Sequence, residues 1–252
     1  MRIRMDDEPM LVIGHRGACV HAPENTIPSC EHARDLGAMW IEADVKKTRD
    51  GALVLMHDQS VDRTTDGTGL VSERSLHEIQ ALDAGTWFGA EFAETRVPTL
   101  EDLASWASTN DMGICLDLGN GGGLTSTDLT AIGQMLRQYD CAETALAIGS
   151  EMATLCELRD QCEEISIGLL YRDNHEDALR RARIARIDFL HPFRRLVSAD
   201  LIRSAHAAGL PVASAVDPLV ELIHERRQWG LDAINCDDPG LCTPPPADEV
   251  LS

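Results

Sequence analysis

The sequence predicts an α/β fold, a (β/α)8 TIM barrel. Short apolar runs alternate with longer helical patterns from one end of the chain to the other, which is the pattern of parallel βαβ units. Eight of the runs read as buried strands, and eight such units close naturally into a barrel. The chain has 252 residues, which matches the ~250 residues that this architecture typically needs.

Each expected element follows from local patterning. The strand candidates are short and apolar, and they cover residues 10–14, 40–45, 113–118, 145–148, 166–170, 188–191, 211–214 and 233–236. A further apolar run, residues 52–57, follows the second strand closely. The helix candidates carry apolar residues at three- and four-residue spacing, and they cover residues 25–37, 99–109, 125–139, 151–162, 174–185, 198–208 and 218–229.

Two segments depart from a regular barrel. Residues 58–98 form a long connection with several turn signals, which predicts a functional insertion or a small subdomain after the second strand. Residues 244–246 are three prolines, which forbid a regular helix there and predict a truncated closing helix. We therefore expect one barrel domain over residues 1–243 and a disordered tail over 244–252. An open doubly wound sheet is the alternative, but glycines 119 and 121–123 lack the spacing of a dinucleotide-binding loop.

The composition excludes some classes of function. The net charge of −20 and the pI of about 4.7 argue against a nucleic-acid partner, because the chain would repel phosphates. No segment has the length of a membrane-spanning helix and the start lacks a secretory signal, so we expect no integral membrane association. The eight cysteines include no CxxC pair, which favours reduced, buried thiols in a cytoplasmic protein.

Three acidic residues stand near the ends of expected strands. Glu42 and Asp44 alternate along the second strand, so both side chains point to the same face. Two carboxylates on the inner face would repel each other without a cation, and all-oxygen ligands favour Mg²⁺ or Ca²⁺. Asp117 near the end of the third strand could share this ion. The alternatives are a solvated acidic pair at a strand end and a capping or ion-paired Asp117.

Two histidines also end apolar runs. His15 ends the first strand and His57 ends the run after the second strand, the positions where barrel enzymes gather catalytic groups. Imidazoles there can act as general acid and base, and Arg16 could clamp phosphate oxygens. A hydrogen-bonded structural role is the alternative for any single histidine. Among the others, only His191 also lies at a strand end.

The order of these motifs resembles the glycerophosphodiester phosphodiesterase family. The resemblance is carried by Gly14-His15-Arg16-Gly17, Pro23-Glu24-Asn25-Thr26, the Glu42-x-Asp44 pair, residues 44–51, His57-Asp58, residues 63–69 and residues 97–101. It covers roughly residues 11–240, and it is specific over the first hundred residues and looser afterwards.

The resemblance implies a metal-dependent phosphodiesterase that hydrolyses glycerophosphodiesters to an alcohol and glycerol phosphate. It implies Glu42, Asp44 and Asp117 as ligands of one divalent metal ion, Mg²⁺ or Ca²⁺. His15 and His57 become the general acid/base pair, and Arg16 the phosphate ligand. Glu24 and Asn25 are expected to give structural support, with Asn25 or Thr26 capping the first helix. The attacking group can be water or a neighbouring substrate hydroxyl, and the expected partner is a small-molecule phosphodiester.

Three positions depart from the family pattern. Asp117 replaces a longer glutamate, Gly119 stands where the family usually has a phosphate-binding lysine, and Ser214 stands where a tryptophan is common. We hypothesise that Lys46, on the same strand face as Glu42 and Asp44, or Arg172, just beyond the fifth strand, supplies the missing cation.

Other functions remain open from the sequence. A lysophospholipase D or a sphingomyelinase-D-like enzyme would use the same metal and histidines. An apolar patch at the barrel mouth, with Leu82, Trp87, Phe88 and Phe92 as candidates, would favour such a lipid substrate. A non-catalytic barrel that only binds a ligand is the third possibility. An uncovered outer side of the last strand would permit an oligomer.

Overall fold

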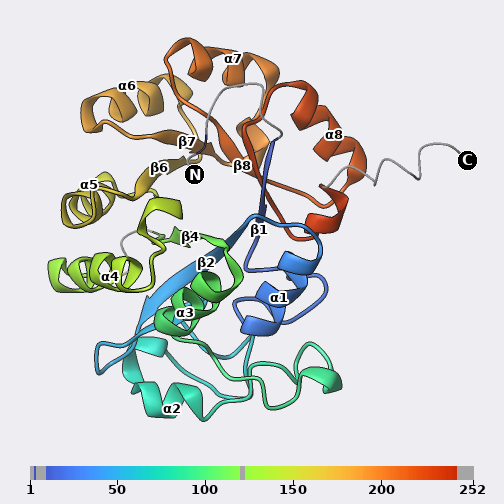
Figure 1. Cartoon of the computed structure of the whole chain (residues 1–252), viewed down its shortest axis with the longest axis vertical. Helices are drawn as coiled ribbons and strands as arrows, with labels where there is room; N and C mark the ends of the chain where they lie inside the picture. The colour runs from blue at the N-terminus through green and yellow to red at the C-terminus, as the bar shows by residue number, and fades with distance from the viewer. Residues whose placement is uncertain (1–2, 4–9, 120–122, 243–252) are drawn as a thin grey trace, which may run out of the picture.

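The structure, a computed structural model, describes residues 3, 10–119 and 123–242. Eight parallel strands form a nearly closed ring, and the helices lie around its outside (Figure 1). The sheet order is β7-β6-β5-β4-β2-β1-β9-β8, and a single parallel bridge between Leu190 and Val212 joins β7 to β8. The predicted barrel is confirmed, and the open doubly wound sheet is wrong.

The elements follow the expected alternation. The strands are β1 (Leu11–Gly14), β2 (Trp40–Lys47), β3 (Leu53–Leu55), β4 (Gly113–Asp117), β5 (Ala145–Gly149), β6 (Ser166–Tyr171), β7 (Phe189–Pro192), β8 (Ala213–Val216) and β9 (Ala233–Cys236). The α-helices are α1 (Ile27–Asp35), α2 (Leu76–Gln80), α3 (Leu100–Asn110), α4 (Ser126–Gln138), α5 (Met152–Gln161), α6 (His175–Ala185), α7 (Ala199–Ala207) and α8 (Val220–Gln228). Short 3-10 turns lie at Val71–Glu73, Ala90–Phe92, Ala142–Thr144, Arg194–Leu196 and Pro239–Leu241.

Strand register separates an inner and an outer face of the ring. On β2 the inner face carries Trp40, Glu42 and Asp44, which pair with Gly113, Cys115 and Asp117 of β4. Apolar side chains of the same parity fill the barrel interior below the acids: Leu11, Ile13, Trp40, Cys115, Leu146, Ile148, Phe189, Ala213 and Ala233. Side chains on the outer face of each strand pack against the helices, and together they form the largest buried cluster. The interior is therefore a packed core, and its acidic groups lie at one end of it.

Residues 58–98 have a small core of their own. β3 returns antiparallel to β2, with Val45 opposite Leu55 and Lys47 opposite Leu53. The connection that follows contains α2 and two 3-10 turns, and it lies at the bottom of the view in Figure 1. Residues of this connection pack with β3 and the residue after it in one buried cluster: Val54, Met56, Val61, Val71, Ile79, Ala84 and Val97. A separate apolar cluster explains how so long a connection stays ordered beside the barrel.

The last two strands differ from the expectation. The seventh barrel strand begins two residues later than predicted, because Pro211 has no N–H to donate and Val212 forms only a bridge. The uncovered outer side expected for the last strand is wrong, since Ile234 and Cys236 are fully buried. A 3-10 turn, Pro239–Leu241, follows this strand within the described residues, and the predicted tail lies outside them.

The expectations about the cysteines and about membrane-spanning helices can be compared with the described part of the chain. All eight cysteines are unpaired thiols, six of them buried. None of the helices there is long and apolar enough to cross a membrane.

Candidate functional site

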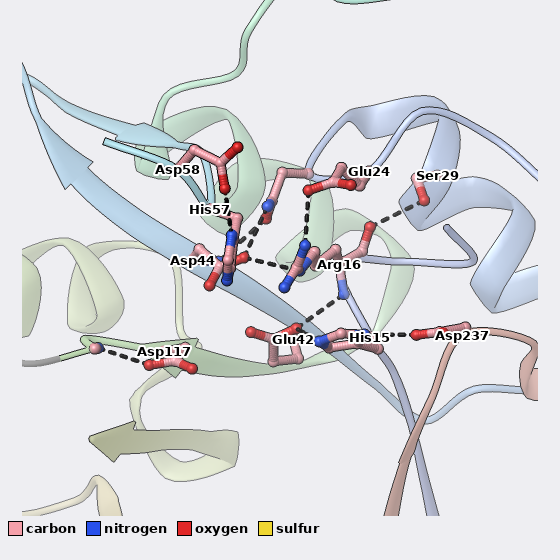
Figure 2. Close-up of polar contacts among 12 residues, drawn as sticks. His15, Arg16, Glu24, Ser29, Glu42, Asp44, His57, Asp58, Asp117 and Asp237 are labelled. Carbon is pink, nitrogen blue, oxygen red and sulfur yellow. Dashed lines mark hydrogen bonds and ion pairs between the residues drawn. The ribbon is translucent and has the colours of Figure 1, made fainter. Parts of the chain in front are cut away.

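Three carboxylates meet at the end of the barrel where the strands finish. Oxygen atoms of Glu42, Asp44 and Asp117 lie within 4.8 Å of one another, and Figure 2 shows them on adjacent strands. The acids on β2 are 1% and 5% exposed, while Asp117 at the end of β4 is half-buried. The alternation of β2 and the in-register pairing of Asp44 with Asp117 produce this arrangement.

The environment of these acids disfavours three negative charges. Burial and the neighbouring Asp44 raise the pKa of Glu42 well above its ordinary value. Burial and the same neighbour also raise the pKa of Asp117, although the N–H of Gly119 donates to its Oδ1 at 2.6 Å. Since the oxygens converge on one point and the acids repel one another, the donor set fits a hard divalent cation.

Arg16 contacts two of the acids through different parts of the residue. Its backbone N–H donates to Glu42 Oε2 at 2.9 Å, and its Nε lies 3.2 Å from Asp44 Oδ2 without the alignment of a hydrogen bond. The backbone is left-handed at Arg16, with φ of 53°, and at Gly17, with φ of 88°. A Cβ at Gly17 would lie 2.3 Å from Ser29 Oγ, so glycine is required for the loop to pass α1.

Glu24 and Asn25 position Arg16 and Asp44. Glu24 accepts a hydrogen bond from Nη1 of Arg16 at 2.8 Å, so the guanidinium is held between two carboxylates. Asn25 donates to Asp44 Oδ2 at 2.9 Å and accepts from the Asp44 backbone N–H at 3.1 Å. The cap of α1 is Thr26, whose hydroxyl accepts from the N–H of Ser29. Asn25 and Thr26 were the two expected caps, and Thr26 is the one that the structure shows.

His15 stands between Glu42 and an acid from the last strand. Its Nδ1 is hydrogen-bonded to Asp237 Oδ1 at 2.6 Å, and its Nε2 lies 3.9 Å from Glu42 Oε2 (Figure 2). Burial alone would lower the pKa of His15, but the hydrogen bonds to Asp237 and Cys19 and the charge of Glu42 raise it well above 6.5. The arrangement fixes the ring and favours its protonated form.

His57 is held by its own carboxylate at the edge of the insertion. Its Nδ1 is hydrogen-bonded to Asp58 Oδ1 at 2.6 Å, and the ring is 46% exposed. Arg63 donates to Asp58 Oδ2 at 2.7 Å and to both oxygens of Glu24. The insertion is therefore tied to Arg16 through Arg63 and Glu24, and its position is linked to that of the acidic cluster.

The two candidate cations lie in different surroundings. Lys46 lies on β2 opposite Val54 of β3 and is half-buried, and its charge lowers the pKa of Asp117 against the effect of burial. Arg172 is exposed, and its guanidinium lies 4.9 Å from the centre of the Phe193 ring. A Cβ at Gly119 would meet nothing within 4 Å, but the backbone there is left-handed, with φ of 58°, a conformation that side-chain-bearing residues rarely adopt.

Ser214 does not face the site. It lies between the inward Ala213 and Ala215 on β8, is fully buried, and donates to the carbonyl of Pro192 at 2.8 Å. Ala215 is the inward residue nearest the mouth on this strand. The side chain of Ser214 therefore points to the helical layer.

His191 is enclosed, whereas His15 and His57 are partly exposed. It is 6% exposed, and its Nδ1 has no hydrogen-bond partner among the described residues. Burial lowers its pKa to about 4, so the ring is neutral at pH 7.

The aromatic residues of the insertion pack on one another. Trp87, Phe88 and Phe92 form edge-to-face contacts with ring centres 5.6 and 5.5 Å apart, and Phe92 reaches His32 of α1 at 6.3 Å. Leu82 joins the core of the insertion. Of the four residues expected to form an apolar patch, only Trp87 is exposed, at 40%.

Some residues of the site had no assigned role in the sequence interpretation. Asp237 directly follows β9, so the strand-end rule that selected His15 could have found it. Asp58 and Arg63 lie inside matched motifs, but their contacts with His57 and Glu24 depend on the fold of the insertion. For Cys19, which is hydrogen-bonded to His15, the sequence carries no signal.

Comparison with known proteins gives one consistent result. The model of the glycerophosphoryl diester phosphodiesterase family matches residues 15–241. A glycerophosphodiester phosphodiesterase of Caldanaerobacter subterraneus subsp. tengcongensis is 32% identical over 229 residues, which are 91% of this chain and 94% of that protein.

Solved structures agree with the sequence comparison. A phosphodiesterase of Oleispira antarctica, solved in complex with the product sn-glycerol-3-phosphate, superimposes with a TM-score of 0.86 at 30% identity, covering 92% of this chain and 94% of that one. A glycerophosphodiester phosphodiesterase of Agrobacterium tumefaciens gives a TM-score of 0.80 at 25% identity, covering 92% and 98%.

Proposed function

The chain belongs to the glycerophosphoryl diester phosphodiesterase family and is a phosphoric diester hydrolase, and we propose that it cleaves glycerophosphodiesters to an alcohol and glycerol phosphate. The observation that carries the proposal is the convergence of Glu42, Asp44 and Asp117 beside Arg16 and His15. The glycerol phosphate bound to the Oleispira relative supports this class of product.

In this proposal Glu42, Asp44 and Asp117 hold one divalent cation, Mg²⁺ or Ca²⁺. Their oxygen donors suit hard cations, and their burial leaves mutual repulsion that a cation offsets. When bound, such an ion neutralises the diester anion and polarises its phosphorus. Asp117 is shorter than glutamate, but the pairing of β2 with β4 brings it within reach of the other two acids.

Arg16 binds the phosphate in this scheme. Glu24 and Asp44 hold its guanidinium on two sides, so the side chain loses little conformational freedom when a diester arrives. A guanidinium offers planar, charge-assisted hydrogen bonds to phosphate oxygens. Lys46, whose charge already acts on Asp117, supplies a second positive charge where the family's lysine is missing.

The two histidines move the protons. His15 favours the protonated form because of Asp237, so we assign it to donate a proton to the departing alcohol oxygen. Asp58 binds Nδ1 of His57, which leaves Nε2 to accept a proton from the nucleophile. With water as the nucleophile the product is glycerol phosphate directly, whereas attack by a glycerol hydroxyl gives a cyclic phosphate first.

Hydrolysis of a panel of glycerophosphodiesters and lysophospholipids tests the function. The purified protein is assayed with Mg²⁺, with Ca²⁺ and with a chelator, and both products are measured. We expect glycerol phosphate from the glycerophosphodiesters, loss of turnover with chelator, and recovery when the ion is restored. Turnover that survives chelation, or no turnover of any diester, would contradict the proposal. A preference for lysophospholipids would move the substrate to the lipid class.

A further inference from the structure

A second group of metal-ligating side chains lies beside the carboxylate cluster. One nitrogen of His15, the sulfur of Cys19 and one oxygen of Asp237 lie within 4.8 Å of one another, and all three residues are partly exposed. The sheet brings them together, because β1 pairs with β9 and the backbone N–H of His15 donates to the carbonyl of Cys236. The phosphodiesterase chemistry proposed above gives Cys19 no task.

We propose that His15, Cys19 and Asp237 form a binding site for a thiophilic divalent cation, of the class of Zn²⁺, and that its occupation inhibits hydrolysis by taking His15 out of proton transfer. The inhibition rests on the proposed function, whereas the binding does not. The two clusters differ in chemistry: one offers only oxygen, and the other offers nitrogen, sulfur and oxygen, the set that borderline and soft ions prefer.

The distances are compatible with a tetrahedral ion. With bonds of about 2.0–2.3 Å, the donor atoms of such a site lie roughly 3.3–3.7 Å apart. The His15 and Asp237 donors are now 2.6 Å apart in a hydrogen bond, so they must separate by roughly 0.7–1.1 Å. Their side chains are 26% and 33% exposed, which leaves room for that rotation. The fourth position would take water or a substrate oxygen, as in other three-ligand sites.

Binding needs no oxidant or reductant. The ion displaces the thiol proton of Cys19 and the proton on the His15 nitrogen that it binds, both protons go to solvent, and a sulfur–metal and a nitrogen–metal bond form. Asp237 gives a carboxylate oxygen in place of its hydrogen bond to His15. The nitrogen that the metal occupies can no longer carry a proton. The net charge of −20 raises the concentration of cations near the surface and favours the encounter.

A second partly exposed cysteine, Cys156, provides a matched control for Cys19. Only Cys19 and Cys156 are partly exposed among the eight cysteines. Cys156 lies on α5, where its sulfur faces the carbonyl of Ala185 at 4.0 Å, away from the histidine and acid that accompany Cys19. A site that depends on the cluster must therefore respond to Cys19→Ser and not to Cys156→Ser.

The experiment has two readouts, both made on the whole protein. Cd²⁺ is titrated while the thiolate-to-metal absorption in the ultraviolet is followed, and Zn²⁺ inhibition is measured at saturating Mg²⁺ relative to each variant's own zinc-free rate. We expect Cys19→Ser to lose the absorption and to need roughly 10–100-fold more Zn²⁺, the range that lost ligand support costs in metal affinity. Cys156→Ser should behave as the wild type.

The outcomes separate this inference from the proposed function. Equal Zn²⁺ inhibition of Cys19→Ser and wild type would mean that zinc acts at the carboxylate cluster, and it would overturn the inference. Absorption that persists in Cys19→Ser, or disappears in Asp44→Asn, would also overturn it. If no diester is hydrolysed the proposed function fails, but the absorption of the two cysteine variants still decides whether the site exists.

Discussion

The two halves of the barrel mouth carry different side chains. From β9 through β1 and β2 to β4, the strand ends present Asp237, His15, Glu42 with Asp44, and Asp117. From β5 to β8, the inward residues nearest the carboxyl ends of the strands are Ile148, Leu170, His191 and Ala215, and the enclosed His191 is the polar one among these four. Charged chemistry is thus concentrated on neighbouring strands, and the opposite wall is apolar. The reactive groups therefore lie close enough to contact one another across neighbouring strands.

The largest expected effect is on the charged half. Glu42→Gln should reduce kcat by ~10³-fold, since a metal centre supplies several kcal/mol of charge stabilisation. The same change should leave the metal-free protein as stable as the wild type or more stable, because burial and Asp44 raise the pKa of Glu42 and disfavour its charge. Turnover numbers and thermal unfolding in chelator measure the two effects. A variant that both unfolds early and loses activity would refute the view that the acids repel.

Replacement of either histidine should cause the next largest loss of activity, and the two variants should differ in how the rate depends on pH. His15→Gln and His57→Gln should each lower kcat by ~10²–10⁴-fold, the range of general acid and base catalysis. In the wild type the rate should fall at high pH as His15 loses its proton, and this limb should vanish in His15→Gln. His57→Gln should keep this limb. Rate profiles over pH check the assignment, and a high-pH limb that persists in His15→Gln and vanishes in His57→Gln would reverse the two roles.

A smaller effect is expected for the two candidate cations, Lys46 on the charged half of the mouth and Arg172 on the apolar half. Lys46→Ala should raise KM for a glycerophosphodiester by ~10-fold, because a hydrogen bond to a charged group contributes about 1.5–3 kcal/mol. Arg172→Ala, whose guanidinium stacks on Phe193 of the apolar half, should change KM by less than about 2-fold. Steady-state kinetics and direct binding of a diester measure this. Unchanged KM in both variants would end the idea of a replacement cation.

The smallest effect concerns the insertion that follows His57. Asp83 accepts hydrogen bonds from the backbone N–H groups of Gly85, Thr86 and Glu94, which lower its pKa below the ordinary 3.8. A depressed pKa gives stability that is present above pH 3.8 and is lost as pH falls through the folded-state value. Asp83→Asn should therefore unfold earlier than wild type at pH 7, and the difference should shrink toward pH 3. The exposed Asp160→Asn on α5 is the control, and a difference independent of pH would contradict this account.

The difference between the two halves of the barrel also determined which inward-facing residues could be predicted from the sequence. Alternation along β2 predicted that Glu42 and Asp44 share a face, and strand ends located His15 and Arg16, because these polar residues interrupt apolar runs. On β8 the run from Val212 to Val216 is small or apolar throughout, so nothing in it reveals which residues point inward. Only the structure shows that Ser214 points to the helical layer. Contacts such as Asp237 with His15 join residues 222 positions apart, and only the closed sheet brings them together.

The backbone of Arg16 has a practical consequence for mutagenesis. Its amide, and not its guanidinium, donates to Glu42, and its carbonyl accepts from the amide of Asn25 and the hydroxyl of Ser29. These three bonds survive any replacement of the side chain except proline. Because the residue is left-handed, asparagine or glycine will tolerate the position better than alanine will. Alanine scanning, the usual choice, would thus mix a distorted turn with a lost charge, whereas Arg16→Asn isolates the charge.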